Sequence, residues 1–229
     1  MPKPTIVIAT PHSRHDPLVD RVRHLLGDYE LIRIRDRGEF THTHLELLSP
    51  RFIFFPHWSW LISEEIYSRF ECVIFHMTDL PYGRGGSPLQ NLIVLGHKST
   101  MLSALRCVAE VDGGPIYLKL PLSLSGTAED ILLRAADLMQ NMIVEIVRLR
   151  PEPIDQEGEP VLFTRRCRED GNLKNLNCVQ QIYDYIRMLE ADGYPPAFLE
   201  TEDFQFEFTG ANIIANAIHA KVCITRRKP

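Results

Sequence analysis

Apolar and polar positions along the chain predict strands that alternate with helices in the N-terminal half. Four short apolar runs, each bounded by polar or turn residues, are typical of buried strands. They cover residues 5–9, 31–34, 52–55 and 72–75. Between the first two runs, Asp16-Pro17 precedes apolar residues at helical spacing, which predicts a capped helix. This order of elements favours an α/β fold with a Rossmann-like, mostly parallel sheet.

The clearest helical pattern of the chain lies between Ser123 and Arg150. Thr127 and Asp130 have the spacing of a capping box at its start. The apolar residues that follow recur on one helical face, as expected of a helix packed on a core.

The polar segment at residues 155–160 follows this helix and predicts a linker. We therefore expect a core over residues 1–150 and a C-terminal appendix over residues 151–229. Short apolar runs and one amphipathic segment near Val179–Leu189 predict that the appendix is a small α+β unit.

Charge and cysteine content narrow the function class. The 229 residues carry a net charge of −5 with both signs spread along the chain, which argues against a nucleic acid partner. The N-terminus lacks a signal-peptide pattern and no apolar run is long enough to span a membrane, so we expect a cytoplasmic protein without a membrane partner. Five cysteines without paired spacing favour free thiols.

A histidine and an aspartate are the leading candidates for chemistry. His76 follows the fourth apolar run, at the end of a strand, where open α/β sheets bind their ligands. Asp112 begins an Asp-Gly turn and supplies a carboxylate, so the two residues form a possible acid/base pair. Taken alone, His76 also fits a buried structural histidine and Asp112 a turn former.

Three segments resemble the formyltransferases that use 10-formyltetrahydrofolate, a family that includes glycinamide-ribonucleotide, methionyl-tRNA and amino-sugar enzymes. In the family signature, His76 matches the histidine, Thr78 the serine, Leu80-Pro81 the Leu-Pro and, with a one-residue slip, Arg84-Gly85 the Arg-Gly. The second segment is Asp112-Gly113-Gly114-Pro115-Ile116, and the third is Arg165 to Gly171 with its sequel up to Phe198. The motifs stand in the family's order between about residues 48 and 200.

The resemblance implies an α/β formyltransferase fold, 10-formyltetrahydrofolate as co-substrate, and His76 and Asp112 as catalytic residues. The family's catalytic asparagine, whose amide holds the oxyanion, stands two residues before the histidine. Here that position is Ile74. The loss of one such donor costs on the order of a hundredfold in rate. Asn91 is the candidate replacement, and its alternative reading is an ordinary residue of a helix surface.

The resemblance also implies a set of folate-binding residues, and two polar loops, at residues 10–15 and 83–86, suggest an acceptor site. The expected folate pocket is lined by His57, Trp58, Trp60, Leu61, Arg106, Val108 and Glu110. The expected acceptor site contains His12, Thr78, Arg84, Gly85 and Gly86. A tryptophan-bearing core loop and a tight turn around His76 remain the alternatives for these segments. His42 and His44 have no third ligand nearby, so we expect no metal site.

The length of the chain bears on which acceptor the enzyme uses. Because methionyl-tRNA enzymes usually carry a longer C-terminal domain, the chain length favours an amino sugar, linked to a nucleotide, as acceptor. A homodimer is the expected assembly. The alternatives are a methionyl-tRNA formyltransferase, a formyl-group hydrolase, and a non-catalytic folate-binding protein, which Ile74 favours.

Overall fold

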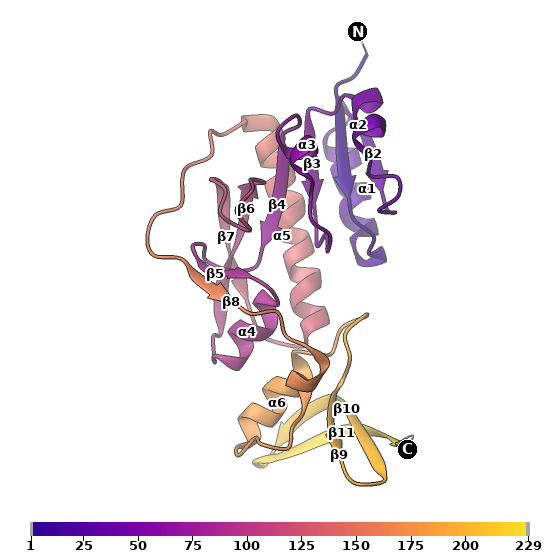
Figure 1. Cartoon of the computed structure of the whole chain (residues 1–229), viewed down its shortest axis with the longest axis vertical. Coiled ribbons are helices and arrows are strands. Elements are labelled where there is room, and N and C mark those ends of the chain that lie inside the picture. Colours follow the sequence, from indigo (N-terminus) through magenta and orange to yellow (C-terminus); the bar gives the residue numbers. More distant parts are fainter. Residues whose placement is uncertain (1, 228–229) are drawn as a thin grey trace. The chain divides into compact units, whose positions relative to one another are not determined.

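The computed structural model describes residues 2–227 and divides them into two compact units (Figure 1). The first unit contains residues 2–84, 101–122 and 133–162, and the second contains residues 85–100, 123–132 and 163–227. Because the chain passes repeatedly between the units, a single boundary at residue 150 does not describe this division. From Phe163 onward, all described residues belong to the second unit.

A six-stranded sheet in the order β2-β1-β3-β4-β6-β7 is built mainly by the first unit. Its strands are β1 (Thr5–Ala9), β2 (Glu30–Ile34), β3 (Phe52–Phe55), β4 (Cys72–His76), β6 (Ser99–Arg106) and β7 (Ile116–Ser123). The pairs β1–β2, β1–β3 and β3–β4 are parallel, whereas β6 is antiparallel to β4. The predicted α/β fold with a mostly parallel sheet is therefore confirmed, and so are the four predicted strands.

The sheet is buried on both faces at its centre. Ile6, Val7 and Ile8 are successive residues of β1, and none of them is exposed. Continuous apolar runs of this kind are expected where helices cover both faces of a parallel sheet. The polar residues in β6 and β7 interrupt such runs, which is why apolar patterning alone did not predict these two strands.

Six α-helices and two short 3₁₀-helices accompany the strands within the described residues. They are η1 (Ser13–His15), α1 (Asp16–Leu25), α2 (His42–Leu48), α3 (Glu64–Tyr67), α4 (Pro88–Val94), α5 (Ala128–Leu149), η2 (Arg168–Gly171) and α6 (Val179–Arg187). The predicted capping box of α5 is confirmed, because Thr127 N lies 2.9 Å from Asp130 Oδ2 and Asp130 N lies 3.2 Å from Thr127 Oγ1.

The C-terminal part of the second unit is a three-stranded antiparallel sheet with α6. Strand β9 (Ala197–Glu200) pairs with β10 (Phe204–Ile214), which pairs with β11 (Ala217–Arg226). Leu173, Ile186 and Ala197 form its small buried core. The predicted α+β character of this segment is confirmed, but its last two strands form a longer hairpin than the apolar runs indicated.

Two further observations complete the description of the fold. Strand β5 (Tyr82–Gly85) pairs with β8 (Val161–Phe163) in a separate two-stranded sheet. Among residues 2–227, no helix is both long enough and apolar enough to cross a membrane.

Candidate active site

His76 ends β4 and lies buried beneath a turn formed by the residues that follow it. Its Nε2 atom lies 2.7 Å from the carbonyl oxygen of Gly83. Because a carbonyl can only accept a hydrogen bond, Nε2 must carry a proton. In the neutral imidazole this leaves Nδ1 as the basic nitrogen, so the turn selects the tautomer.

Asp112 faces that basic nitrogen. Its Oδ2 atom lies 3.4 Å from His76 Nδ1, and only about an eighth of its side chain is exposed. The loop after β6 can turn sharply because Gly114 has no side chain, since a Cβ atom there would lie 1.9 Å from the carbonyl oxygen of Arg106. The structure therefore brings together the two residues that the sequence marked as an acid/base pair.

Gln156 fixes the Asp112 turn, and sequence reasoning did not identify it. Its Nε2 group donates to the carbonyl oxygens of Asp112 at 2.7 Å and Gly114 at 2.8 Å. Its Oε1 atom accepts from Arg84 Nε and Nη2. Gln156 lies 44 residues from Asp112 in a polar segment, so no local pattern connects the two.

Arg84 does not present its charge to the surroundings. The residue is 7% exposed, and its Nη1 atom forms an ion pair with Glu110 Oε1 at 2.7 Å. Its remaining side-chain contacts go to Gln156. The geometry thus contradicts the prediction that Arg84 binds the acceptor, because the guanidinium is used internally to hold the loop that carries Glu110 and Asp112.

Gly85 and Gly86 also serve packing and not ligand binding. A Cβ atom on Gly85 would lie 2.6 Å from the carbonyl oxygen of Phe163, and one on Gly86 would lie 2.6 Å from the Cα of Arg165. The Gly86 N–H donates to Phe163 O at 3.1 Å. Because the chain at residues 163–165 covers these glycines, they do not form the predicted acceptor cradle.

Thr78 holds the same turn from inside. It is fully buried, its Oγ1 lies 3.4 Å from Gly83 O, and its carbonyl accepts from Ser103 Oγ at 2.8 Å. A fully buried hydroxyl cannot contact an acceptor, so the prediction that Thr78 binds substrate is wrong in this geometry.

Asn91 does not supply the missing oxyanion donor. Its Nδ2 group lies 3.0 Å from both Gly86 O and Thr164 O. An amide has two N–H bonds, and these two carbonyls use both. The prediction that Asn91 replaces the family's asparagine is therefore contradicted by geometry.

Ile74 occupies the position of that asparagine within an apolar environment. Successive side chains of a strand alternate between faces, so Ile74 lies on the same face of β4 as His76. It is partly buried and packs against a core cluster that includes Phe55 and Cys72.

Two loops of the first unit expose apolar side chains of the kind that bind a flat ring. Leu61, in the loop after β3, is 90% exposed, and Val111, next to Asp112, is 58% exposed. These loops also carry the predicted folate-binding residues Val108 and Glu110, together with Trp60, whose ring packs edge-on to that of Trp58 at 4.6 Å.

Other predicted folate-binding side chains lie elsewhere or face inward. Arg106 forms an ion pair with Glu71 at 2.7 Å. Glu71 directly precedes β4, so this ion pair lies at the opposite end of that strand from His76. Trp58 packs on Phe40 and Phe55 with ring centroids 5.2 and 6.0 Å apart, and so belongs to the core.

Three histidines cluster where β1 and β3 end. His15 Nδ1 lies 2.6 Å from Thr10 Oγ1, and His15 Nε2 lies 3.0 Å from His57 Nδ1. The His12 ring lies edge-on to that of His15, with ring centroids 6.0 Å apart. Burial, reinforced by neighbouring His57, His12 and arginines, lowers the pKa of His15 to about 2. Burial, then His12 and Arg14, lowers the pKa of His57 to about 3.

The rings of His15 and His57 are therefore neutral at ordinary pH. Sequence reasoning selected His12 and His57 but missed His15, whose position is set by the turn into α1. His42 and His44 belong to α2, and no group of three or more potential ligand side chains among residues 2–227 is arranged to hold a metal ion.

Comparison with known proteins identifies the family. A solved structure of methionyl-tRNA formyltransferase from Clostridium thermocellum is 42% identical, covers 98% of this chain and all of its own, and superposes with a TM-score of 0.95. Residues 168–225 match the family model described as the C-terminal domain of methionyl-tRNA formyltransferase. Methionyl-tRNA formyltransferase of Bacillus cytotoxicus is 26% identical over 180 residues, which are 75% of this chain and 57% of that protein.

The chain thus spans little more than half the length of the curated relatives that it matches. A 4-N formyltransferase from Francisella tularensis, with a TM-score of 0.68 over 87% of this chain and 93% of its own, is only 15% identical and shows the fold alone.

These findings overturn two predictions, the amino-sugar acceptor and the absence of a nucleic acid partner. Both rested on chain length and net charge. Residues 168–225 match the model of the C-terminal domain of methionyl-tRNA formyltransferase, and a solved structure with that name is covered over its whole length by this chain. With 42% identity over essentially the whole of both chains, this protein belongs to the formyltransferase family.

Proposed function

We propose that this protein transfers the formyl group of 10-formyltetrahydrofolate to the amino group of methionyl-tRNA. The observation that carries the proposal is the 42% identity, over essentially the whole of both chains, to a protein named methionyl-tRNA formyltransferase. The match of residues 168–225 to the C-terminal domain of such enzymes supports the same acceptor.

The geometry at His76 suits the proton transfers of this reaction. The neutral amine attacks the formyl carbon, and the new C–N bond leaves an excess proton on the amine nitrogen. His76 Nδ1, left basic because Gly83 holds the proton on Nε2, accepts that proton. Asp112, 3.4 Å away, stabilises the imidazolium that results.

The second half of the reaction returns the proton. The bond between the formyl carbon and N10 of the folate breaks, and the imidazolium gives its proton to N10. The products are the N-formyl amide and tetrahydrofolate, and His76 regains its neutral tautomer. In this scheme Gln156 acts as a positioning residue, because it holds the backbone on both sides of the Asp112 turn.

In this proposal the co-substrate packs against the exposed apolar loops of the first unit. Leu61 and Val111 offer apolar surface against which a flat pterin ring can pack. Arg84 and Glu110 brace the loop that carries Val111 and Asp112.

A second candidate function is folate binding without catalysis. Two observations favour it: Ile74 stands where the family has its oxyanion donor, and both N–H groups of Asn91 are already used. A protein of this kind would bind the folate and leave methionyl-tRNA unmodified.

The experiment that separates the two candidates is a formylation assay. The full chain is mixed with 10-formyltetrahydrofolate and initiator methionyl-tRNA, and the amino acid released from the tRNA is identified by mass. Formylmethionine supports the proposal, whereas folate binding in calorimetry without formylmethionine supports the non-catalytic candidate. Formate release without an acceptor would instead indicate a hydrolase.

A further inference from the structure

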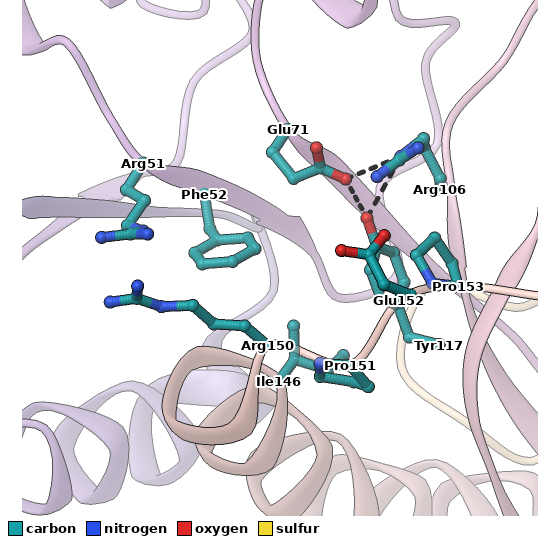
Figure 2. Close-up of a pocket in the computed structure, with 10 residues that line it drawn as sticks. All are labelled: Arg51, Phe52, Glu71, Arg106, Tyr117, Ile146, Arg150, Pro151, Glu152 and Pro153. Atoms are coloured by element: carbon teal, nitrogen blue, oxygen red, sulfur yellow. Dashed lines mark hydrogen bonds and ion pairs between the residues drawn. The ribbon is translucent and has the colours of Figure 1, made fainter.

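A hollow of about 230 Å³ lies in the first unit, at the end of the sheet where strands β3 and β4 begin (Figure 2). Strands β3 and β4 are parallel and β4 ends at His76, so the hollow lies at the opposite end of these strands from His76. Its lining residues are Arg51, Phe52, Glu71, Arg106, Tyr117, Ile146, Arg150, Pro151, Glu152 and Pro153. The catalytic scheme above uses none of them.

The charges of the hollow are satisfied at one end only. Glu71 forms an ion pair with Arg106 at 2.7 Å and also accepts from the Tyr117 hydroxyl. At the other end, Arg51 and Arg150 extend their guanidinium groups toward each other, with Phe52 and Ile146 between them and the Glu71 cluster (Figure 2). Glu152, an exposed carboxylate, lies on the Tyr117 side.

Neither of these two guanidinium groups has a hydrogen-bond or ion-pair partner among the described residues. The carbonyls at the C-terminus of α5 would be a structural reason for cations here. Only the Arg150 backbone N–H donates to one of them, at 2.9 Å from the carbonyl oxygen of Ile146. The two guanidinium groups donate to none of them among the described residues, so their N–H groups remain available to an anion. Two converging cations repel each other, and an anion between them removes that repulsion.

The backbone at Arg150 adds a second argument. Arg150 directly follows α5 and has a φ of 50°, in the left-handed region where a helix end usually carries glycine. Glycine would be the more stable residue there. The arginine therefore contributes through its side chain, which has no partner within the described protein.

We propose that this hollow binds the phosphate group of a phosphorylated small molecule. Two guanidinium forks match the charge and the acceptor oxygens of a phosphate dianion better than those of a carboxylate. Phe52 and Pro151 line the hollow and offer apolar surface for the rest of the ligand. The inference does not depend on the proposed activity, because the hollow lies where β3 and β4 begin, whereas His76 lies where β4 ends.

The test measures binding of inorganic phosphate and of adenosine 5′-monophosphate to the full chain by calorimetry and thermal shift, without folate or tRNA. Arg51→Gln should weaken phosphate binding by about tenfold or more, since one charge-assisted contact is lost. Arg37→Gln, which removes an exposed arginine of the loop between β2 and α2, is the matched control and should bind as the wild type does.

Arg150→Gly separates binding from folding. Glycine relieves the left-handed conformation, so the Tm should rise by about 2 °C while phosphate binding falls by about tenfold or more. Wild-type protein that shows neither heat nor thermal shift in about 20 mM phosphate would overturn the proposal. Equal binding of acetate would also overturn it, and so would Arg51→Gln protein that binds phosphate normally but tRNA weakly.

Discussion

His76 Nε2 lies 2.7 Å from the carbonyl oxygen of Gly83, a residue of the turn that His76 itself opens. The contact fixes which ring nitrogen carries the proton, and it directs the basic nitrogen toward Asp112. The glycine-rich turn therefore sets the chemistry of the site through one main-chain oxygen, and its own glycines need not touch a ligand.

Asp112→Asn should lower kcat by about a hundredfold or more and change folate affinity little. The substitution removes the charge that stabilises the imidazolium but keeps the shape of the side chain. Because Asp112 has a φ of 52°, and asparagine tolerates the left-handed region well, the turn should still form. Steady-state kinetics would check this, with Asp155→Asn, an exposed carboxylate of the linker, as control. Rates near those of the wild type would remove Asp112 from the mechanism.

Ile74→Asn should raise kcat by about tenfold or more, because it places an amide donor beside His76 on the same face of β4. It should also lower the free energy of unfolding by about 1–3 kcal/mol, since a polar group enters an apolar cluster. Ile74→Val keeps the apolar contact without the amide and should leave the rate unchanged. Equal rates for both variants would mean that an amide at this position has no oxyanion to hold.

Gly86→Ala should destabilise the fold by about 1–3 kcal/mol, because the added Cβ would lie 2.5 Å from the Cβ of Arg165 and 2.6 Å from its Cα. Gly27→Ala is a matched control, with its nearest neighbouring atom at 3.8 Å, and should change stability by less than about 0.5 kcal/mol. Denaturant unfolding of both variants gives the comparison. Equal stability would show that residues 163–165 do not lie against this glycine in solution.

The free energy of unfolding should fall as the pH drops below about 6.5. Unfolded histidines take up protons near pH 6.5, whereas His15 and His57 stay neutral in the fold until about pH 2 and 3. Over that interval the unfolded state binds more protons, and each histidine costs about 1.4 kcal/mol of stability per pH unit.

The variant His57→Asn isolates this effect. It keeps a polar atom near His15 but removes one of the two titrations, so the loss of stability per pH unit should be smaller than in wild type by about 1.4 kcal/mol. Denaturant unfolding at about pH 7 and pH 5 measures the difference, and carboxylates that titrate in both proteins cancel. An unchanged slope would mean that His57 takes up its proton in the folded state.

The strands and the pairing of His76 with Asp112 were predictable because their signals are local. Apolar runs of four or five residues bounded by turns marked β1 to β4, and the family motifs marked His76 and Asp112. The capping box of α5 likewise needs only Thr127 and Asp130.

Contacts between distant segments could not be predicted from the sequence. Gln156 reaches Asp112 across 44 residues, and Thr164 accepts from Asn91 across 73, so neither pair leaves a local pattern. The error at Gly85 and Gly86 has the same origin, because the chain that fills the space over them comes from residues 163–165. The net charge led to the wrong prediction that no nucleic acid is a partner, because a net charge does not show where positively charged side chains cluster on the surface.

The most direct test of the central claim compares wild-type protein with His76→Gln in the formylation of methionyl-tRNA. Glutamine can still donate to Gly83 O but has no basic nitrogen facing Asp112, so the turn should hold while proton transfer fails. We expect wild-type protein to form formylmethionine, and His76→Gln to form it about a hundredfold or more slowly with a Tm within about 3 °C of wild type. Equal rates for the two proteins, or no formylmethionine from the wild type, would contradict the account.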